Sequence, residues 1–276
     1  MKSICAMSLV SLALAASFKQ IVSFGDSITD TGNLYRMTSG RDPSRQEYYN
    51  GRFSNGPTWV EYLAKLLKAS LVDQSYGGAT SDMNMDRSSG VPGCIQQVDE
   101  FARSSKRTND FNATLVTIVF QGNDFFLPRA TAQGYMRNMD VCLHKVLGLG
   151  YKYVMVSTSN APEVTPAFPM SSFIQRRKFT SITDQLPAMW NRELQQVKRE
   201  FNDVTFYTMD LKGFYHAVAD GAIPLSDGKK PISSTPCLQS GVKCSDPDNY
   251  MFWDSIHPST SMHKAMANYA SSRITN

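Results

Sequence analysis

A buried strand that runs into a turn is predicted at Ile21-Val22-Ser23-Phe24-Gly25-Asp26-Ser27. The apolar residues before Gly25 form a short run of the kind found in strands that are covered on both faces. Similar runs, most of them followed by glycine or other small residues, recur along the chain, and they predict further strands at 113–120, 151–157 and 204–209.

Helical periodicity appears between these strands. Apolar residues recur at steps of three and four within 58–68 and within 184–201, where Pro187 falls in the first turn and costs no hydrogen bond there. Helices that alternate with short buried strands predict an α/β fold with a single doubly wound, mainly parallel sheet and helices on both faces. In such a sheet the ligand site lies beyond the carboxyl ends of the strands.

The composition is that of a globular protein. The chain has 276 residues, of which 42% are hydrophobic and 19% are charged. These values exclude collagen, coiled coils and bulk disorder. The formal net charge of +4 is small and dispersed, so the sequence gives no reason to expect a nucleic-acid partner.

The first sixteen residues have the pattern of a secretory signal peptide. A lysine near the start precedes a short apolar stretch, and small residues around Ala15 and Ala16 suit cleavage. The alternative is an N-terminal core helix or anchor, but the run is shorter than the ~20 apolar residues of a transmembrane helix. We therefore expect a signal peptide at 1–16, a single domain at 17–276, and a secreted or, in a bacterium, periplasmic protein without a transmembrane segment.

Export makes disulfides the expected state of the cysteines, because oxidising compartments favour them. Of the five cysteines, Cys5 leaves with the signal peptide. Cys237 and Cys244 bracket a short loop and form the favoured pair, which leaves Cys94 and Cys142 by elimination. Four cysteines permit three pairings, and the sequence does not choose among them. The histidines show no metal-ligand spacing, so we expect neither a metal nor another cofactor.

Three groups suit the chemistry of a serine nucleophile. Ser27 lies just past the first strand, where unpaired N–H groups stabilise developing negative charge. Asp254 precedes His257 by three residues, a spacing that can place the carboxylate on Nδ1 and leave Nε2 for the serine. Gly77-Gly78 and Asn123 could supply further donors to an oxyanion. Taken singly, each group is more typical of a turn or a helix cap than of a catalytic site.

The joint order of these groups resembles the GDSL esterase/lipase family of the SGNH hydrolase superfamily. The matching stretches are Phe24 to Asn33, Asn50 to Ala64, Tyr76 to Thr80, Gly122 to Asp124, and Asp254 to Pro258. The second stretch is similar to the branch that contains plant GDSL enzymes and bacterial hemolysin or phospholipase-type members. Chance agreement of five ordered stretches is implausible.

The resemblance implies a flavodoxin-like three-layer sandwich and a serine esterase. It assigns Ser27 as the nucleophile, His257 as the base and Asp254 as its orienting acid, with Ser27, Gly78 and Asn123 as oxyanion donors. The segment before Gly77 and the region between the third and last stretches match the family only loosely, which leaves the choice of substrate open.

The expected substrate is a small-molecule or lipid ester, cleaved through an acyl-enzyme, with acyl transfer, (lyso)phospholipase activity and transient contact with a lipid surface as further expectations. The alternatives are an acetylesterase acting on carbohydrate and a non-catalytic exported binding protein for lipid or polysaccharide. The sequence does not indicate an oligomeric state. The residues expected to line an acyl pocket are Phe125, Phe126, Leu127, Phe168 and Met170.

Overall fold

The computed structural model describes residues 17–120, 122–226 and 230–275. The expected signal peptide at 1–16 lies outside the described residues. Within them, no helix is both long enough and apolar enough to cross a membrane.

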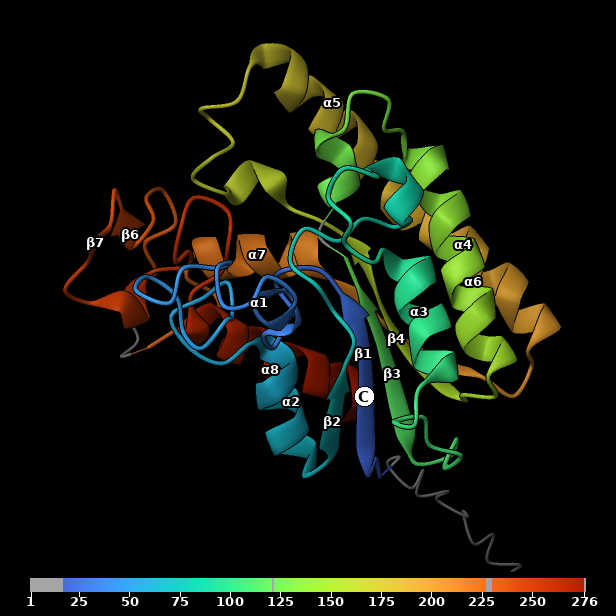
Figure 1. Ribbon diagram of the computed structural model, residues 1–276. Coiled ribbons are helices and arrows are strands. Elements are labelled where there is room, and N and C mark those ends of the chain that lie inside the picture. Colours follow the sequence, from blue (N-terminus) through green and yellow to red (C-terminus); the bar gives the residue numbers. More distant parts are fainter. Residues whose placement is uncertain (1–16, 121, 227–229, 276) are drawn as a thin grey trace, which may run out of the picture.

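A five-stranded parallel sheet forms the centre of the molecule (Figure 1). Its strands follow the order β2-β1-β3-β4-β5, so the chain winds outward in both directions from β1 and β3. The predicted doubly wound α/β fold is thus confirmed. The strands are β1 (Gln20–Gly25), β2 (Ser70–Asp73), β3 (Thr114–Val119), β4 (Tyr153–Ser159) and β5 (Thr205–Asp210).

Side chains of the central strands alternate between two cores, one on each face of the sheet. In β1, Val22 and Phe24 join one core and Ile21 joins the other, as the two-residue period of a strand requires. In β3, Val116 and Leu115 divide in the same way. Burial on both faces explains why these strands are continuous apolar runs.

Helices cover both faces, as Figure 1 shows. One face packs against α3, α4 and α6, and the other against α2, α7 and α8. These helices are α2 (Trp59–Leu67), α3 (Cys94–Arg103), α4 (Ala132–Gly148), α6 (Leu186–Glu200), α7 (Leu211–Ala219) and α8 (Thr260–Thr275).

The other described elements lie in the loops at the carboxyl edge of the sheet and beyond it. They comprise α1 (Asn33–Met37), α5 (Phe173–Thr183), the 3₁₀ helices η1 (Met83–Met85), η2 (Asn123–Phe126), η3 (Pro162–Val164) and η4 (Pro247–Asn249), and the hairpin of β6 (Leu238–Gln239) and β7 (Val242–Lys243).

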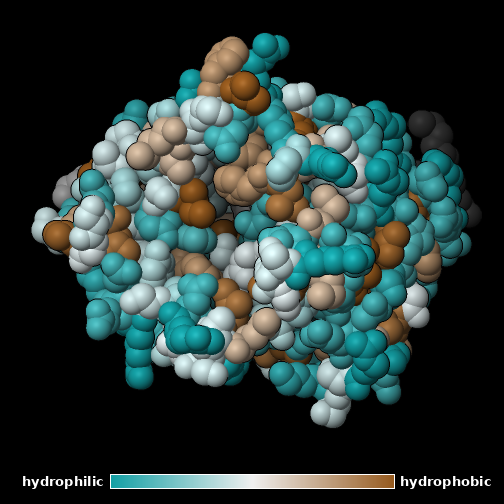
Figure 2. Space-filling view, turned by 45° about the horizontal axis from the view of Figure 1, so that its top comes forward, coloured by the Kyte–Doolittle hydropathy of each residue, from teal (hydrophilic) through white to brown (hydrophobic). Residues whose placement is uncertain are grey.

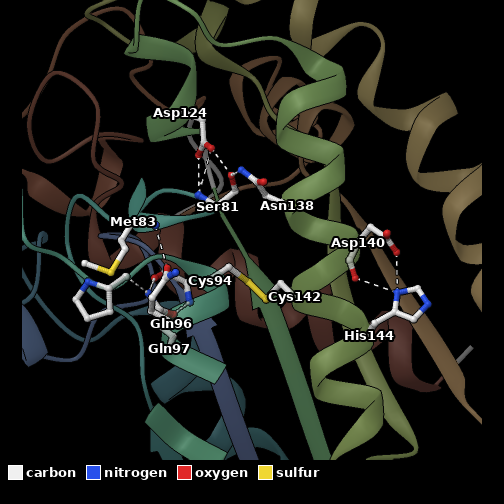
Figure 3. The surroundings of a disulfide bond; sticks show 12 residues. Ser81, Met83, Cys94, Gln96, Gln97, Asp124, Asn138, Asp140, Cys142 and His144 are labelled. Carbon is white, nitrogen blue, oxygen red and sulfur yellow. Dashed lines mark hydrogen bonds and ion pairs between the residues drawn. A yellow bond between two sulfur atoms is a disulfide. The ribbon is translucent and has the colours of Figure 1, made fainter. Parts of the chain in front are cut away.

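Two disulfides brace the fold. Cys94, the first residue of α3, pairs with Cys142 in the middle of α4 (Figure 3). Cys237 pairs with Cys244 and closes the β6–β7 hairpin. This is the pairing that the sequence favoured among three alternatives.

Candidate active site

Ser27 follows β1 in a tight turn at the carboxyl edge of the sheet. The Asp26 carbonyl accepts the N–H groups of Thr29 and Asp30, each at 3.0 Å, and this closes the turn around Ser27. A Cβ at Gly25 would lie 2.7 Å from the Val119 carbonyl oxygen, so only glycine fits where the turn leaves the sheet. The Ser27 N–H has no hydrogen-bond partner among the described residues and remains available to a ligand.

The buried side chain of Gln97 fixes the end of β1 from the side. Its amide accepts the Gly25 N–H at 3.0 Å and donates to the Gly25 carbonyl at 2.9 Å. Because both backbone groups of Gly25 are held by one side chain, the strand end that carries Ser27 has a defined position.

His257 lies between Ser27 and Asp254. Its Nε2 is 3.0 Å from Ser27 Oγ, and its Nδ1 is 2.6 Å from Asp254 Oδ2. The other carboxylate oxygen accepts the backbone N–H groups of Ile256 at 2.9 Å and His257 at 2.7 Å. The structure therefore brings together the three side chains that the sequence assigned to one site.

The charge state of Asp254 follows from these contacts. Burial by itself would raise the pKa of Asp254, but the charge and hydrogen bond of His257, the Ile256 N–H and the Tyr48 hydroxyl lower it to about 2. Asp254 is therefore ionised at neutral pH, and an ionised carboxylate holds the imidazole with its Nδ1 protonated and its Nε2 free to accept a proton.

Tyr48 and Phe53 complete the surroundings of His257, and neither was predicted to belong to the site. The Tyr48 hydroxyl donates to Asp254 Oδ2 at 2.7 Å, and the Phe53 ring packs 4.9 Å from the imidazole at an angle of 33°. Phe53 lies in one of the stretches that carry the family resemblance. Tyr48 had no signal in the sequence, because it lies outside these stretches and its partner is 206 residues away.

Gly77 and Gly78 form a loop beside Ser27. The Tyr76 N–H bonds to the Gly25 carbonyl at 3.2 Å, which places the loop against the end of β1. Gly78 has a φ of 76°, a left-handed conformation that favours glycine, and a Cβ at Gly77 would clash with the Phe53 ring at 2.2 Å. The Gly78 N–H has no partner among the residues described.

A buried carboxylate holds this loop from behind. Asp30 Oδ2 accepts the Gly77 N–H at 2.8 Å and the Leu34 N–H at 3.1 Å. Burial and the neighbouring Asp73 raise the pKa of Asp30 to about 6, against the lowering effect of its N–H donors. Asp30 thus ties the Ser27 turn to the glycine loop.

Asn123 opens η2, just beyond the end of β3, and faces the same loop. Its Nδ2 donates to the Ala79 carbonyl at 2.9 Å, which occupies one of its two N–H groups and leaves the second for a ligand. The next residue, Asp124, accepts the Ser81 N–H at 2.9 Å and also its hydroxyl, while Asn138 donates to that hydroxyl (Figure 3). These bonds hold Asn123 next to the glycine loop.

A pocket of about 750 Å³, part of it open to solvent, adjoins Ser27, Asn123 and His257. Its other walls are largely apolar. The predicted pocket residues Phe125, Phe126 and Phe168 line it. Further apolar residues that were not predicted also line it, namely Ile28, Phe179, Tyr215 and Ile256.

Leu127 and Met170 differ from the expectation, since neither lines the pocket. Leu127 caps η2, and its side chain turns toward the core under α3 and α4. Met170 lies in the loop before α5 with 86% of its surface exposed. Phe168 and Ser171, on either side of Met170, both line the pocket, so the prediction was wrong because the Met170 side chain faces solvent instead.

One group of side chains among the described residues could hold a metal, and it lies away from the Ser27 pocket. Ligand atoms of Asp140, His144 and Glu193 lie within 4.8 Å of one another. Both ring nitrogens of His144 already face carboxylates, Asp140 Oδ1 at 2.6 Å and Glu200 Oε2 at 3.1 Å (Asp140 and His144 are drawn in Figure 3). This arrangement is that of an ion-paired histidine between α4 and α6.

Comparison with known proteins gives the site its context. The model of the GDSL-like lipase/acylhydrolase family matches residues 21–270. A thermolabile hemolysin of Vibrio parahaemolyticus is 25% identical over 259 residues, which are 90% of this chain and 62% of that protein. A phosphatidylcholine-sterol acyltransferase of Aeromonas hydrophila is 40% identical over 84 residues, which are 28% of this chain and 25% of that protein.

The chain thus spans less than two thirds of the length of these two relatives. Among solved structures, a lipolytic protein of the G-D-S-L family from Veillonella parvula superposes with a TM-score of 0.50 at 14% identity, covering 93% of this chain and 98% of that one. This likeness bears on the fold alone. With the family match running from β1 into α8, the chain belongs to the GDSL-like lipase/acylhydrolase family.

Proposed function

We propose that the protein cleaves carboxylic esters through an acyl-enzyme formed on Ser27. The observation that carries this proposal is a chain of two hydrogen bonds at the wall of an apolar pocket. Ser27 Oγ is 3.0 Å from His257 Nε2, and His257 Nδ1 is 2.6 Å from Asp254. A serine hydroxyl becomes a competent nucleophile when a neutral imidazole at this distance accepts its proton.

The reaction proceeds in two halves. Ser27 Oγ attacks the ester carbonyl as His257 takes its proton, and the oxyanion that forms is stabilised by the N–H groups of Ser27, Gly78 and Asn123. His257 then gives the proton to the departing alcohol, which leaves an acyl-serine. Water deprotonated by His257 attacks this acyl group and releases the acid; a second alcohol in place of water gives acyl transfer.

The lining of the pocket favours esters whose acyl group is an aliphatic chain of some length. Its walls carry the rings of Phe125, Phe168 and Phe179, and such surfaces favour aliphatic chains over the hydroxyl-rich surface of a carbohydrate. The relatives named as a hemolysin and a phosphatidylcholine-sterol acyltransferase support a lipid ester in the same way.

We further propose that the mature enzyme, residues 17–276, is one catalytic domain that works outside the cytoplasm. The two disulfides support this location, because they persist in oxidising compartments.

Hydrolysis of p-nitrophenyl esters tests the nucleophile. Ser27→Ala should lower kcat/KM for p-nitrophenyl butyrate by at least about 1,000-fold, since removal of a triad nucleophile leaves only the oxyanion donors and binding. Ser255→Ala is the matched control, because Ser255 is an exposed serine one residue from Asp254 and should leave the rate unchanged. Undiminished turnover by the Ser27 variant would refute the mechanism.

A further inference from the structure

An exposed group of apolar side chains borders the mouth of the Ser27 pocket. We call this group the apolar rim; among the residues described it consists of Phe126, Met170, Phe173, Ile174 and Ile256. Met170, Ile174 and Phe173 are the most exposed, at 86%, 78% and 65%. Figure 2 shows brown and tan residues both at the top of the molecule and around a hollow near the centre of this face.

The local sequence explains why these side chains face solvent. Ser172 and Gln175 form a capping box that starts α5 at Phe173. The buried side of the helix is formed further along by Phe179 and Ile182, so the first turn carries Phe173 and Ile174 outward. In Figure 1 the first turn of α5 stands clear of the rest of the molecule.

The rim is continuous with the pocket. Phe126 and Ile256 belong to both, and the Phe126 ring contacts Phe179 at 5.0 Å. The segment before α5 is tied to the Asp254–His257 loop by the Ala167 N–H, which donates to the Ser255 carbonyl at 2.9 Å. An apolar path therefore leads from the outer tip of α5 to Ser27.

Such exposure indicates a partner, because each large apolar side chain favours an apolar environment over water by about ten-fold or more. The charged residues next to the rim indicate what kind of partner it binds. The stretch 165–183 contains three basic residues and no acidic residue, namely Arg176, Arg177 and Lys178, and Arg129 follows η2 on the other side.

The three basic side chains of α5 differ in what they contact. Arg176 donates to the Pro169 carbonyl at 3.1 Å and also to the Ser171 carbonyl, and Lys178 donates to the Leu127 carbonyl, so both brace the rim. Arg177 is exposed, and its guanidinium lies 5.7 Å from the centre of the Phe173 ring. A guanidinium beside an exposed aromatic ring suits a lipid headgroup, whose phosphate it can bind with two parallel hydrogen bonds.

We propose that the apolar rim and the basic residues of α5 form a docking surface for phospholipid bilayers that carry anionic headgroups. The proposal rests on the proposed function in one respect: docking by this surface presents the Ser27 pocket to the acyl chains of the bilayer. Phe173 and Ile174 insert among the acyl chains nearest the surface, and Arg177 contacts the phosphates above them.

Vesicle flotation with the full chain carrying Ser27→Ala tests the docking surface without any contribution from catalysis. The vesicles are phosphatidylcholine alone or phosphatidylcholine with phosphatidylglycerol as a minor component. Phe173→Ser with Ile174→Ser should lower the partition coefficient at least about ten-fold. Arg177→Gln should lower it about five-fold on the anionic vesicles and by less on phosphatidylcholine, whose headgroup has a phosphate but no net charge.

Val242→Ser is the matched control, because Val242 is 71% exposed on β7, away from the rim. It should bind vesicles like the parent protein, and equal melting temperatures should show that every variant is folded. Equal partition of the Phe173/Ile174 variant and the control would overturn the proposal. A second result would also overturn it: sedimentation showing that the parent protein is a dimer and the Phe173/Ile174 variant a monomer, with no vesicle binding by the parent. The rim would then be covered by a second copy of the chain.

The two proposals fail separately. If the protein hydrolyses p-nitrophenyl butyrate rapidly but does not bind vesicles, the docking surface is refuted and the proposed mechanism stands. If the protein binds vesicles but its Ser27→Ala variant keeps full turnover, the proposed mechanism is refuted and the docking surface stands.

Discussion

Tyr48 shows how a single side chain outside the catalytic triad can govern the site. Its hydroxyl donates to Asp254 Oδ2, the oxygen that also faces His257 Nδ1. That oxygen of Asp254 therefore faces two donors. The loop that carries Tyr48 is also bound to the Asp254 segment by Trp253 Nε1, which donates to the Glu47 carbonyl at 3.1 Å. Tyr48 is a positioning residue, since it acts on the imidazole through the carboxylate.

We expect Tyr48→Phe to lower kcat for p-nitrophenyl butyrate by about ten-fold with little change in KM. A hydrogen bond to a charged group contributes about 1.5–3 kcal/mol, part of which is lost from the orientation of Asp254 in the transition state. Tyr49→Phe is the control, because the exposed Tyr49 hydroxyl has no hydrogen bond to the described residues. A change confined to KM would show that Tyr48 acts on substrate binding instead.

Among single residues, the sequence pointed to those that lie in a distinctive motif and missed those that do not. Ser27, Asp254 and His257 were assigned from their motifs, and the structure places His257 within hydrogen-bonding distance of both Ser27 and Asp254. Tyr48 and Gln97 could not be found in this way, because a tyrosine in a loop and a glutamine in a helix carry no pattern that points to Asp254 or Gly25.

The disulfide between α3 and α4 ties together elements that flank the site. Cys94 and Cys142 are 48 residues apart, and the loop they close contains β3 and η2, hence Asn123. The second disulfide spans only 7 residues within the β6–β7 hairpin. Because a longer closed loop restricts the unfolded chain more, the two should differ in their contribution to stability.

Replacing each pair by alanine should reveal this difference in urea unfolding. From loop length, we expect Cys94→Ala with Cys142→Ala to lower the free energy of unfolding by about 4 kcal/mol, and Cys237→Ala with Cys244→Ala by about 2 kcal/mol. The second double variant serves as the control for the first. An equal or smaller loss for the Cys94/Cys142 variant would contradict the expectation.

Secondary structure was predictable where burial leaves a clear pattern, either a continuous apolar run in a strand covered on both faces or an apolar stripe on one face of a helix. The strands at 113–120, 151–157 and 204–209 and the helices at 58–68 and 184–201 correspond to β3, β4, β5, α2 and α6. The edge strand β2 was missed because its four residues are too few to show a period. The helix α5 was missed because Phe173 and Ile174 face solvent, which breaks the amphipathic pattern.

His263, a completely buried histidine in α8, is expected to contribute to the loss of stability in acid. Its Nδ1 accepts the Trp59 N–H at 3.2 Å and so joins α8 to the start of α2. Burial, with a smaller effect of the nearby His257, lowers the pKa of His263 from 6.5 to about 3. The unfolded chain therefore binds a proton at a pH where the folded protein does not.

Stability should consequently fall as the pH drops through 6.5 toward 3, by up to about 4 kcal/mol from this residue. His263→Asn keeps an acceptor for Trp59 but cannot titrate. In urea unfolding the variant should be less stable than the parent near neutral pH, and the difference should shrink or reverse in acid. A difference that stays constant across this range would show that His263 does not set the acid limit.

Ser27 and His257 are separated by 230 residues in the sequence, and this separation has a consequence for biosynthesis. At about 5–20 residues per second, a ribosome takes roughly 10–50 seconds to pass from one to the other. Throughout that interval the nascent chain carries a nucleophile without its base, and the base arrives only with the segment that becomes α8. Under the proposed mechanism the order of translation thus keeps the growing polypeptide inert toward the lipids of the cell that makes it.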